Sequence, residues 1–108
     1  MSILKKMNEE DIIGYFGQIF SKIRSAKEEV DHIIIGPQDW FYAREVYNFF
    51  DFEKNKERFE KGCCAKIWGA QIWIAPEATE IKAYSKNQFN ILKEDFPNIA
   101  HTIKRLGL

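Results

Sequence analysis

The chain has 108 residues, of which 45% are hydrophobic and 15% aromatic, so it fits one folded domain with a single core and leaves no room for two. Sixteen basic residues balance sixteen acidic ones, so the broad positive field that attracts proteins to nucleic acid or to anionic membranes is missing. No run approaches the roughly 18 apolar residues of a membrane span, and the first eight residues lack the apolar core of a secretory signal, so we expect a cytoplasmic protein.

The first predicted element is an amphipathic helix over residues 9–30. Its apolar side chains recur at helical spacing and form one stripe, made of Ile12, Ile13, Phe16, Ile19, Phe20 and Ile23. Asn8 is placed to cap this helix, and the acidic residues 9–11 suit the positive end of its dipole. Gly14 and Gly17 lie on one side of the helix. They mark either a close approach by another backbone or glycines tolerated in a helix that tertiary packing holds.

An apolar strand and a second helix are predicted next. His32 to Ile35 form a β-branched run without alternation, which indicates a strand covered on both faces and central in its sheet. Proline is favoured at the first position of a helix, so a helix is predicted from Pro37 to about Phe50. Its aromatic residues spread around the whole helix. This distribution indicates either an ordinary aromatic core or a protein interface. Trp40, Ala43, Tyr47 and Phe50 would share one side, and Phe41, Tyr42, Val46 and Phe49 the rest.

Residues 51–61 are charged nearly throughout and are predicted to form a solvated helical extension or a mobile loop. Two strand-like runs follow, residues 63–68 and 70–75, and they are joined at Gly69. Gly69 fits two roles, because glycine permits both. It is either the first central residue of a tight turn with Ala70 or a kink within one long strand.

A third strand is predicted at residues 80–84, after a turn at residues 76–79, and the three strands suggest an antiparallel unit. In the tail, Asn87 is a candidate cap, and Pro97 divides the helical pattern into one kinked helix or two short ones. Residues 1–108 are thus predicted to form one α+β domain. It would consist of a mostly antiparallel sheet of about four strands packed with two to three helices.

Strand geometry makes Trp73 the main candidate for a protein interface. If residues 70–75 form a strand, Ile72 and Ile74 face one way, whereas Gln71 and Trp73 face the other. A tryptophan on an exposed face of mixed polarity suits the centre of an interface. The alternative is that a helix covers Trp73 and the sheet is buried on both sides. The predicted interface residues are Trp73, Gln71, Phe41, Tyr42 and Phe49.

Two segments carry a family resemblance. In VDHIIIGPQDW an apolar strand ends in a proline-containing turn and leads into a helix, and in GCCAKIWGAQIWIAPEATEIKAY a strand with a Trp-Gly step leads into a short hairpin. Residues 30–84 thereby resemble the later part of the major capsid proteins of tailed bacteriophages. The resemblance implies a structural role in the domain around the centre of a capsomer, without catalytic residues. The arm, extended loop and spine helix of that family have no counterpart here, which implies an accessory relative.

Four residues, Cys63, Cys64, His32 and His101, match the count that a structural zinc site needs. Zinc-binding cysteines usually stand two to four residues apart, whereas neighbours in a strand point to opposite faces. We therefore predict no metal site. An adjacent pair forms a disulfide only through a strained ring, so both thiols are expected to be reduced. No local signature supports a cysteine nucleophile with a histidine base.

Glu80 and Lys82 have the acid-x-lysine spacing of metal-dependent nucleases, in which a carboxylate holds Mg²⁺ and the lysine steadies the attacked phosphate. A chain of this composition contains about two such spacings by chance. Glu77 is a poor second carboxylate, because it lies in the predicted turn. We predict no catalytic residue and no cofactor.

Two functions from different classes follow from the sequence. The first is a non-enzymatic structural or assembly protein of a phage virion or capsid, which acts through self-association or other protein–protein contacts. The alternative is a small cytosolic protein-binding module that regulates a phage or host protein by occlusion, and a nuclease-like enzyme comes third. A capsid relative would self-associate or co-purify with particles, whereas a regulator would be a monomer bound to one protein. Neither function needs a membrane or nucleic acid as partner.

Overall fold

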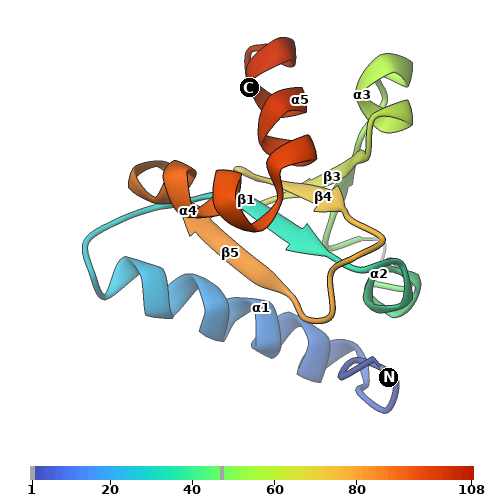
Figure 1. Ribbon diagram of the computed structural model, residues 1–108. Coiled ribbons are helices and arrows are strands. Elements are labelled where there is room, and N and C mark those ends of the chain that lie inside the picture. Colours follow the sequence, from blue (N-terminus) through green and yellow to red (C-terminus); the bar gives the residue numbers. More distant parts are fainter. Residues whose placement is uncertain (1, 47) are drawn as a thin grey trace.

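The computed structural model describes residues 2–46 and 48–108, which form five α-helices and one five-stranded sheet (Figure 1). The strand order is β2-β3-β4-β1-β5, in which β1 and β4 are parallel and the other three pairs are antiparallel. The α+β class and the mostly antiparallel sheet are therefore confirmed. In chain order the elements are α1 (Glu9–Arg24), β1 (Val30–Ile35), α2 (Pro37–Ala43), β2 (Asp51–Phe52), α3 (Lys56–Glu60), β3 (Cys63–Ile67), β4 (Ala70–Ile74), β5 (Lys82–Ser85), the 3₁₀ helix η1 (Lys86–Gln88), α4 (Phe89–Asp95) and α5 (Pro97–Leu106).

Helices cover both faces of the sheet (Figure 1). On one face, side chains of α1 and α2 pack in a cluster that includes Phe16, Trp40 and Ile72. On the other face, side chains of α4 and α5 pack in a second cluster around Trp73 and Leu92. The apolar run of β1 contributes to both clusters, since Ile33 and Ile35 belong to the first and Ile34 to the second. No helix in the described part of the chain combines the length and the apolar character that crossing a bilayer requires.

Helix α1 begins as predicted but ends early. The Asn8 side chain accepts a hydrogen bond from the Asp11 backbone N–H at 2.8 Å, which satisfies one free donor of the first turn. The helix ends at Arg24 rather than at residue 30, because Val30 is needed in the sheet, where it pairs with Ser85. A Cβ atom at Gly14 or Gly17 would meet no atom within 4 Å. Both glycines are thus tolerated within this chain rather than required by a close approach.

Strand β1 was predicted to be central, and it lies between β4 and β5, so it is not an edge strand, although β4 is the middle strand of the five described. Helix α2 was expected to reach about residue 50, and it ends at Ala43. The chain must turn back at this point, because the two-residue strand β2 pairs antiparallel with β3. Val46 and Phe50 are still buried in the core, although they lie outside the helix. Tyr47 lies outside the described residues.

The charged segment, predicted as a helical extension or a mobile loop, holds a short strand, β2, and a separate short helix, α3. The strands of the described residues therefore number five rather than about four. Asn55 caps α3, since its side chain accepts from the Arg58 backbone N–H at 3.1 Å. Two residues of strand and five of helix are too short to produce a periodic pattern in a sequence. In residues 2–46 and 48–108 the α-helices number five rather than two to three, because α3 and the division of the tail at Pro97 add to the predicted count.

The turn between β3 and β4 is a hairpin, which excludes the strand kink. Ile67 pairs with Ala70, so the two central residues are Trp68, with φ 49°, and Gly69, with φ 87°. Positive φ at both central residues is the signature of a type I′ turn. The tight turn is therefore confirmed, but Gly69 is its second central residue and Ala70 already belongs to β4.

The predicted antiparallel unit of three strands is wrong, because β5 pairs with β1 and not with β4. The tail forms two helices, and Pro97 begins the second of them. Asn87 lies within η1 and does not cap a helix. The cap is Ser85, whose side chain and backbone exchange hydrogen bonds with Gln88 in a capping box.

Candidate protein-binding surface

We give the name aromatic surface to Phe49, Phe52 and Trp68: the rings of Phe49 and Trp68 are in contact, and Phe50 links Phe52 to Phe49. It lies on the α1 face of the sheet, since Phe49, Trp68 and Phe52 contact side chains of the cluster on that face, beside the β3–β4 turn and edge strand β2. Trp68 is 51% exposed and Phe52 39%, while Phe49 is half-buried. The Trp68 ring meets the rings of Phe20 and Phe49 edge to face, at centroid distances of 4.9 and 5.0 Å. Edge-to-face contact is a favoured arrangement of aromatic rings, so the Trp68 ring packs against the core while about half of its side chain stays in solvent.

The backbone of Trp68 is strained. A positive φ costs a bulky residue about 1–2 kcal/mol, and the first central position of a type I′ turn favours Asn, Asp or Gly instead. Here a tryptophan holds φ 49° and half of its side chain remains in solvent. Residues held in rarely populated backbone conformations cluster at binding and catalytic sites. Trp68 thus combines strain with exposure at the tip of a hairpin.

Three of the predicted interface residues are at least partly exposed. Phe49 belongs to the aromatic surface. Phe41 and Tyr42 form a separate pair on α2 with ring centroids 5.3 Å apart. Phe41 is 50% exposed, and the guanidinium carbon of Arg44 lies 4.9 Å from its ring centroid. Trp68 and Phe52 were not predicted. A Trp-Gly pair between two strands could have indicated Trp68, because hairpin turns lie at the surface.

The prediction that Trp73 and Gln71 lie on an exposed face is wrong. Trp73 is fully buried and Gln71 is only 9% exposed, because α4 and α5 cover this face of β4. The alternation along the strand was correct, since Ile72 belongs to the opposite cluster. The alternative, a sheet buried on both sides, therefore holds. Trp73 belongs to the core and not to an interface.

A hydrogen bond between Trp73 and His32 determines which imidazole nitrogen carries the proton. Trp73 Nε1 donates to His32 Nδ1 at 3.1 Å, and an indole can only donate. The neutral imidazole of His32 therefore carries its proton on Nε2, which lies 3.4 Å from the Asp31 carboxylate. Neither nitrogen has a free lone pair for a metal ion or for general base catalysis. His32 thus acts in the core as a hydrogen-bonded packing group.

The stability of the fold is expected to fall as the pH drops below about 6.5. Burial lowers the pKa of His32 from its ordinary 6.5, although the Asp31 carboxylate opposes this shift. Because the unfolded chain takes up a proton at His32 more readily than the folded chain, His32 contributes its full stability above pH 6.5 and loses it as the pH falls toward its folded pKa. Thermal melts between about pH 8 and pH 5.5 measure this loss.

The control is His32→Asn, whose amide oxygen takes the position of Nδ1, can still accept from Trp73 and does not titrate. Its melting temperature should depend less on pH in the same window. An equal pH dependence in the variant and in the parent chain would assign the effect to other groups.

The two cysteines point to opposite faces of the sheet, as adjacency in a strand predicts. Cys63 packs in the Trp73 cluster and Cys64 in the Ile72 cluster. Both thiols are free and buried. Burial and the neighbouring carboxylate of Glu53 raise the pKa of Cys63 to about 12, and burial also raises the pKa of Cys64. Since the thiolate is the nucleophile, neither cysteine is suited to nucleophilic catalysis.

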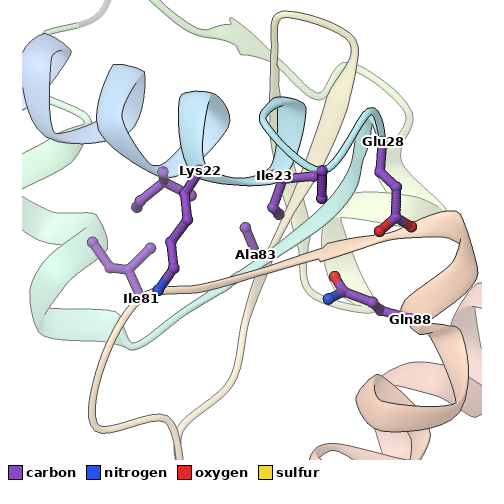
Figure 2. Close-up of a pocket in the computed structure, with 8 residues that line it drawn as sticks. Lys22, Ile23, Glu28, Ile81, Ala83 and Gln88 are labelled. Carbon is purple, nitrogen blue, oxygen red and sulfur yellow. The ribbon is translucent and has the colours of Figure 1, made fainter.

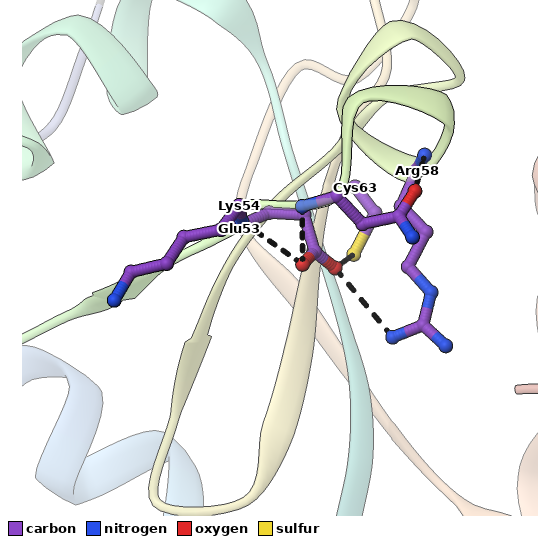
Figure 3. A network of polar contacts seen from close by, with 5 residues as sticks. Glu53, Lys54, Arg58 and Cys63 are labelled. Carbon is purple, nitrogen blue, oxygen red and sulfur yellow. Dashed lines mark hydrogen bonds and ion pairs between the residues drawn. The ribbon is translucent and has the colours of Figure 1, made fainter.

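Glu53 organises the loop between β2 and α3 (Figure 3). One carboxylate oxygen accepts from the backbone N–H groups of Lys54 and Asn55, at 3.1 and 3.3 Å. The other oxygen accepts from the Cys63 thiol at 3.7 Å and lies 3.8 Å from the Arg58 guanidinium. These contacts occupy both oxygens of Glu53, which therefore holds the loop against β3.

The acid-x-lysine pair meets a third group in the structure. Lys82 Nζ lies 3.8 Å from a carboxylate oxygen of Glu80 and 3.8 Å from one of Asp95. The Tyr84 hydroxyl donates to Asp95 at 2.7 Å, and burial together with this contact raises the pKa of Tyr84. The lysine thus balances the carboxylates that would bind Mg²⁺. Within residues 2–46 and 48–108, no three or more His, Cys, Asp or Glu side chains gather where they could hold a metal ion.

The aromatic surface is accordingly the best candidate for a functional site. Its exposed rings are held by packing, whereas the titratable groups described above are engaged in contacts within the fold. Comparison with protein-family models, with curated proteins and with solved structures finds no match to this chain.

Proposed function

We propose that the chain is a non-enzymatic structural or assembly protein that acts through protein–protein contacts at the aromatic surface. The observation that carries this proposal is Trp68, which is 51% exposed in a strained turn conformation. Tryptophan is strongly enriched among the residues that dominate binding energy at protein interfaces. Its packing against Phe20 and Phe49 also reduces the entropy that binding would cost.

The sequence resemblance favours a phage virion or capsid as the assembly. Two polar groups of the core support a non-enzymatic role, because their contacts serve the fold itself. His32 is held by Trp73 and Asp31, and the Cys63 thiol donates to Glu53. We therefore assign the aromatic surface to self-association or to docking on another virion protein.

Replacing Trp68 by asparagine is expected to weaken association about 30-fold or more while sparing the fold. An interface hot spot contributes about 2 kcal/mol or more. Asn-Gly is the favoured pair of a type I′ turn, so the variant relieves backbone strain and keeps the hairpin. Sedimentation of the purified protein over a range of concentrations measures association, and a thermal melt verifies the fold.

The matched control is Phe59→Ala, because Phe59 is 59% exposed on α3 and lies outside the aromatic surface. It should associate as the parent chain does. If Trp68→Asn and Phe59→Ala both associate like the parent chain, the aromatic surface is not the contact that we propose.

A further inference from the structure

Strand β5 leaves its outer edge unpaired in the described part of the chain, where its only strand partner is β1. Such an edge presents backbone N–H and C=O groups that can pair with another strand, and a lysine on the edge often prevents this. Lys82 stands on this edge, but its amino group lies 3.8 Å from both Glu80 and Asp95. Its charge is therefore balanced within the chain, and the edge is not protected by it.

A cleft of about 350 Å³ runs along this edge between α1 and β5 (Figure 2). Its middle is apolar, and its charged groups stand at its two ends. Lys22 reaches from α1 toward the end near Ile81, while Glu28 stands at the other end, near Gln88. The apolar lining consists of Ile19, Ile23, Ala26, Ile81 and Ala83.

We propose that β5 pairs antiparallel with β5 of a second copy of this chain, across a two-fold axis perpendicular to the sheet. An antiparallel two-fold pairing reverses the cleft, so the Lys22 end of one copy meets the Glu28 end of the other. Each interface then contains two identical Lys22–Glu28 contacts between copies. The two clefts join into one apolar surface, and the sheets of both copies become continuous.

The charges at both ends are available for this contact. No ion pair of Lys22 occurs among the described residues. Glu28 accepts a hydrogen bond from the Ser85 hydroxyl at 2.7 Å through one carboxylate oxygen, which orients the carboxylate and leaves the second oxygen for a partner. The two-fold axis thus brings the positive Lys22 end of one copy to the negative Glu28 end of the other. An isologous interface requires this kind of self-complementarity.

This interface extends the proposed function and does not depend on it. The β5 edge and the β2 edge beside the aromatic surface lie on opposite sides of the sheet. A chain with one interface at each edge could add further copies beyond a dimer.

Charge reversal tests the pairing. Lys22→Glu places two carboxylates face to face in each half of the dimer, and Glu28→Lys places two ammonium groups there. Each variant alone should dimerise at least about tenfold more weakly than the parent chain in sedimentation at low salt. An equimolar mixture of the two variants should regain the parent affinity, because every contact in the mixed dimer then joins opposite charges. Amide hydrogen exchange should show concentration-dependent protection in β5.

The control is Lys6→Glu, which makes the same charge change at an exposed lysine outside the cleft, and it should dimerise normally. Glu28→Lys also loses the bond from Ser85, so circular dichroism must verify its fold, and Lys22→Glu provides the test without that loss. Three results would each overturn the proposal. Lys22→Glu could dimerise as tightly as the parent chain, the mixture of variants could fail to regain the parent affinity, or the parent chain could remain monomeric up to about 1 mM. If Trp68→Asn weakens association while the charge-reversal variants and their mixture behave as predicted, the loss is assigned to the aromatic surface and not to the β5 edge.

Discussion

Replacing Trp73 by alanine is expected to lower the free energy of unfolding by about 3–5 kcal/mol, the range measured when a buried aromatic residue is truncated. Trp73 is 0% exposed, and its cluster includes Ile34, Leu92 and Ile103, so truncation leaves a cavity between the sheet and α5. The change also removes the donor that satisfies His32 Nδ1, and an unsatisfied buried acceptor adds to the loss. Urea unfolding followed by circular dichroism measures the difference.

Two variants separate packing from hydrogen bonding at this position. Trp73→Phe keeps most of the ring volume but removes the N–H group, so it should cost about 1–3 kcal/mol. Trp68→Asn, the exposed tryptophan, should change stability by much less. A Trp73→Ala chain within about 1 kcal/mol of the parent would contradict the burial of Trp73 beneath α4 and α5.

Gly36→Ala is expected to destabilise the fold by about 1–3 kcal/mol, as overpacking does in closely packed cores. A Cβ atom at position 36 would lie 2.7 Å from the backbone oxygen of Ala78. The loop that carries this oxygen cannot easily withdraw, because the Ala75 N–H donates to the Ile35 oxygen at 2.9 Å and the Ala78 N–H to the Ala75 oxygen at 3.0 Å. The added methyl group must therefore push two backbone segments apart. Urea unfolding and thermal melts measure the loss.

The matched control is Gly14→Ala, the same substitution at a position with open space. A Cβ atom there meets nothing within 4 Å, and glycine in an exposed helix interior is less favourable than alanine by about 0.5–1 kcal/mol. This variant should gain about that amount. Equal stabilities of Gly36→Ala and the parent chain would show that the loop at Ala78 moves freely.

The elements with strong local patterns were predictable from the chain. Residues 9–24 repeat their apolar side chains at helical spacing and begin at a capping asparagine, and both features act within one or two turns. The unalternating run of β1 indicated cover on both faces, whereas Gly69 fitted either a tight turn or a strand kink until the pairing of Ile67 with Ala70 decided for the turn. Helix α2 ended early for a nonlocal reason, because β2 has to reach β3, and two residues of strand leave no periodic pattern.

The pairing of strands and the location of the candidate surface depended on contacts between distant residues. The alternation along β4 placed Gln71 and Trp73 on one face, but whether that face was exposed depended on α4 and α5, which come later in the chain. Likewise, β1 lies between β4 and β5, so neighbours in sequence are not neighbours in the sheet. Periodicity shows which side chains share a face of a strand. Only the packing of distant elements decides which face is covered, and here it buried Trp73 and left Trp68 at the surface.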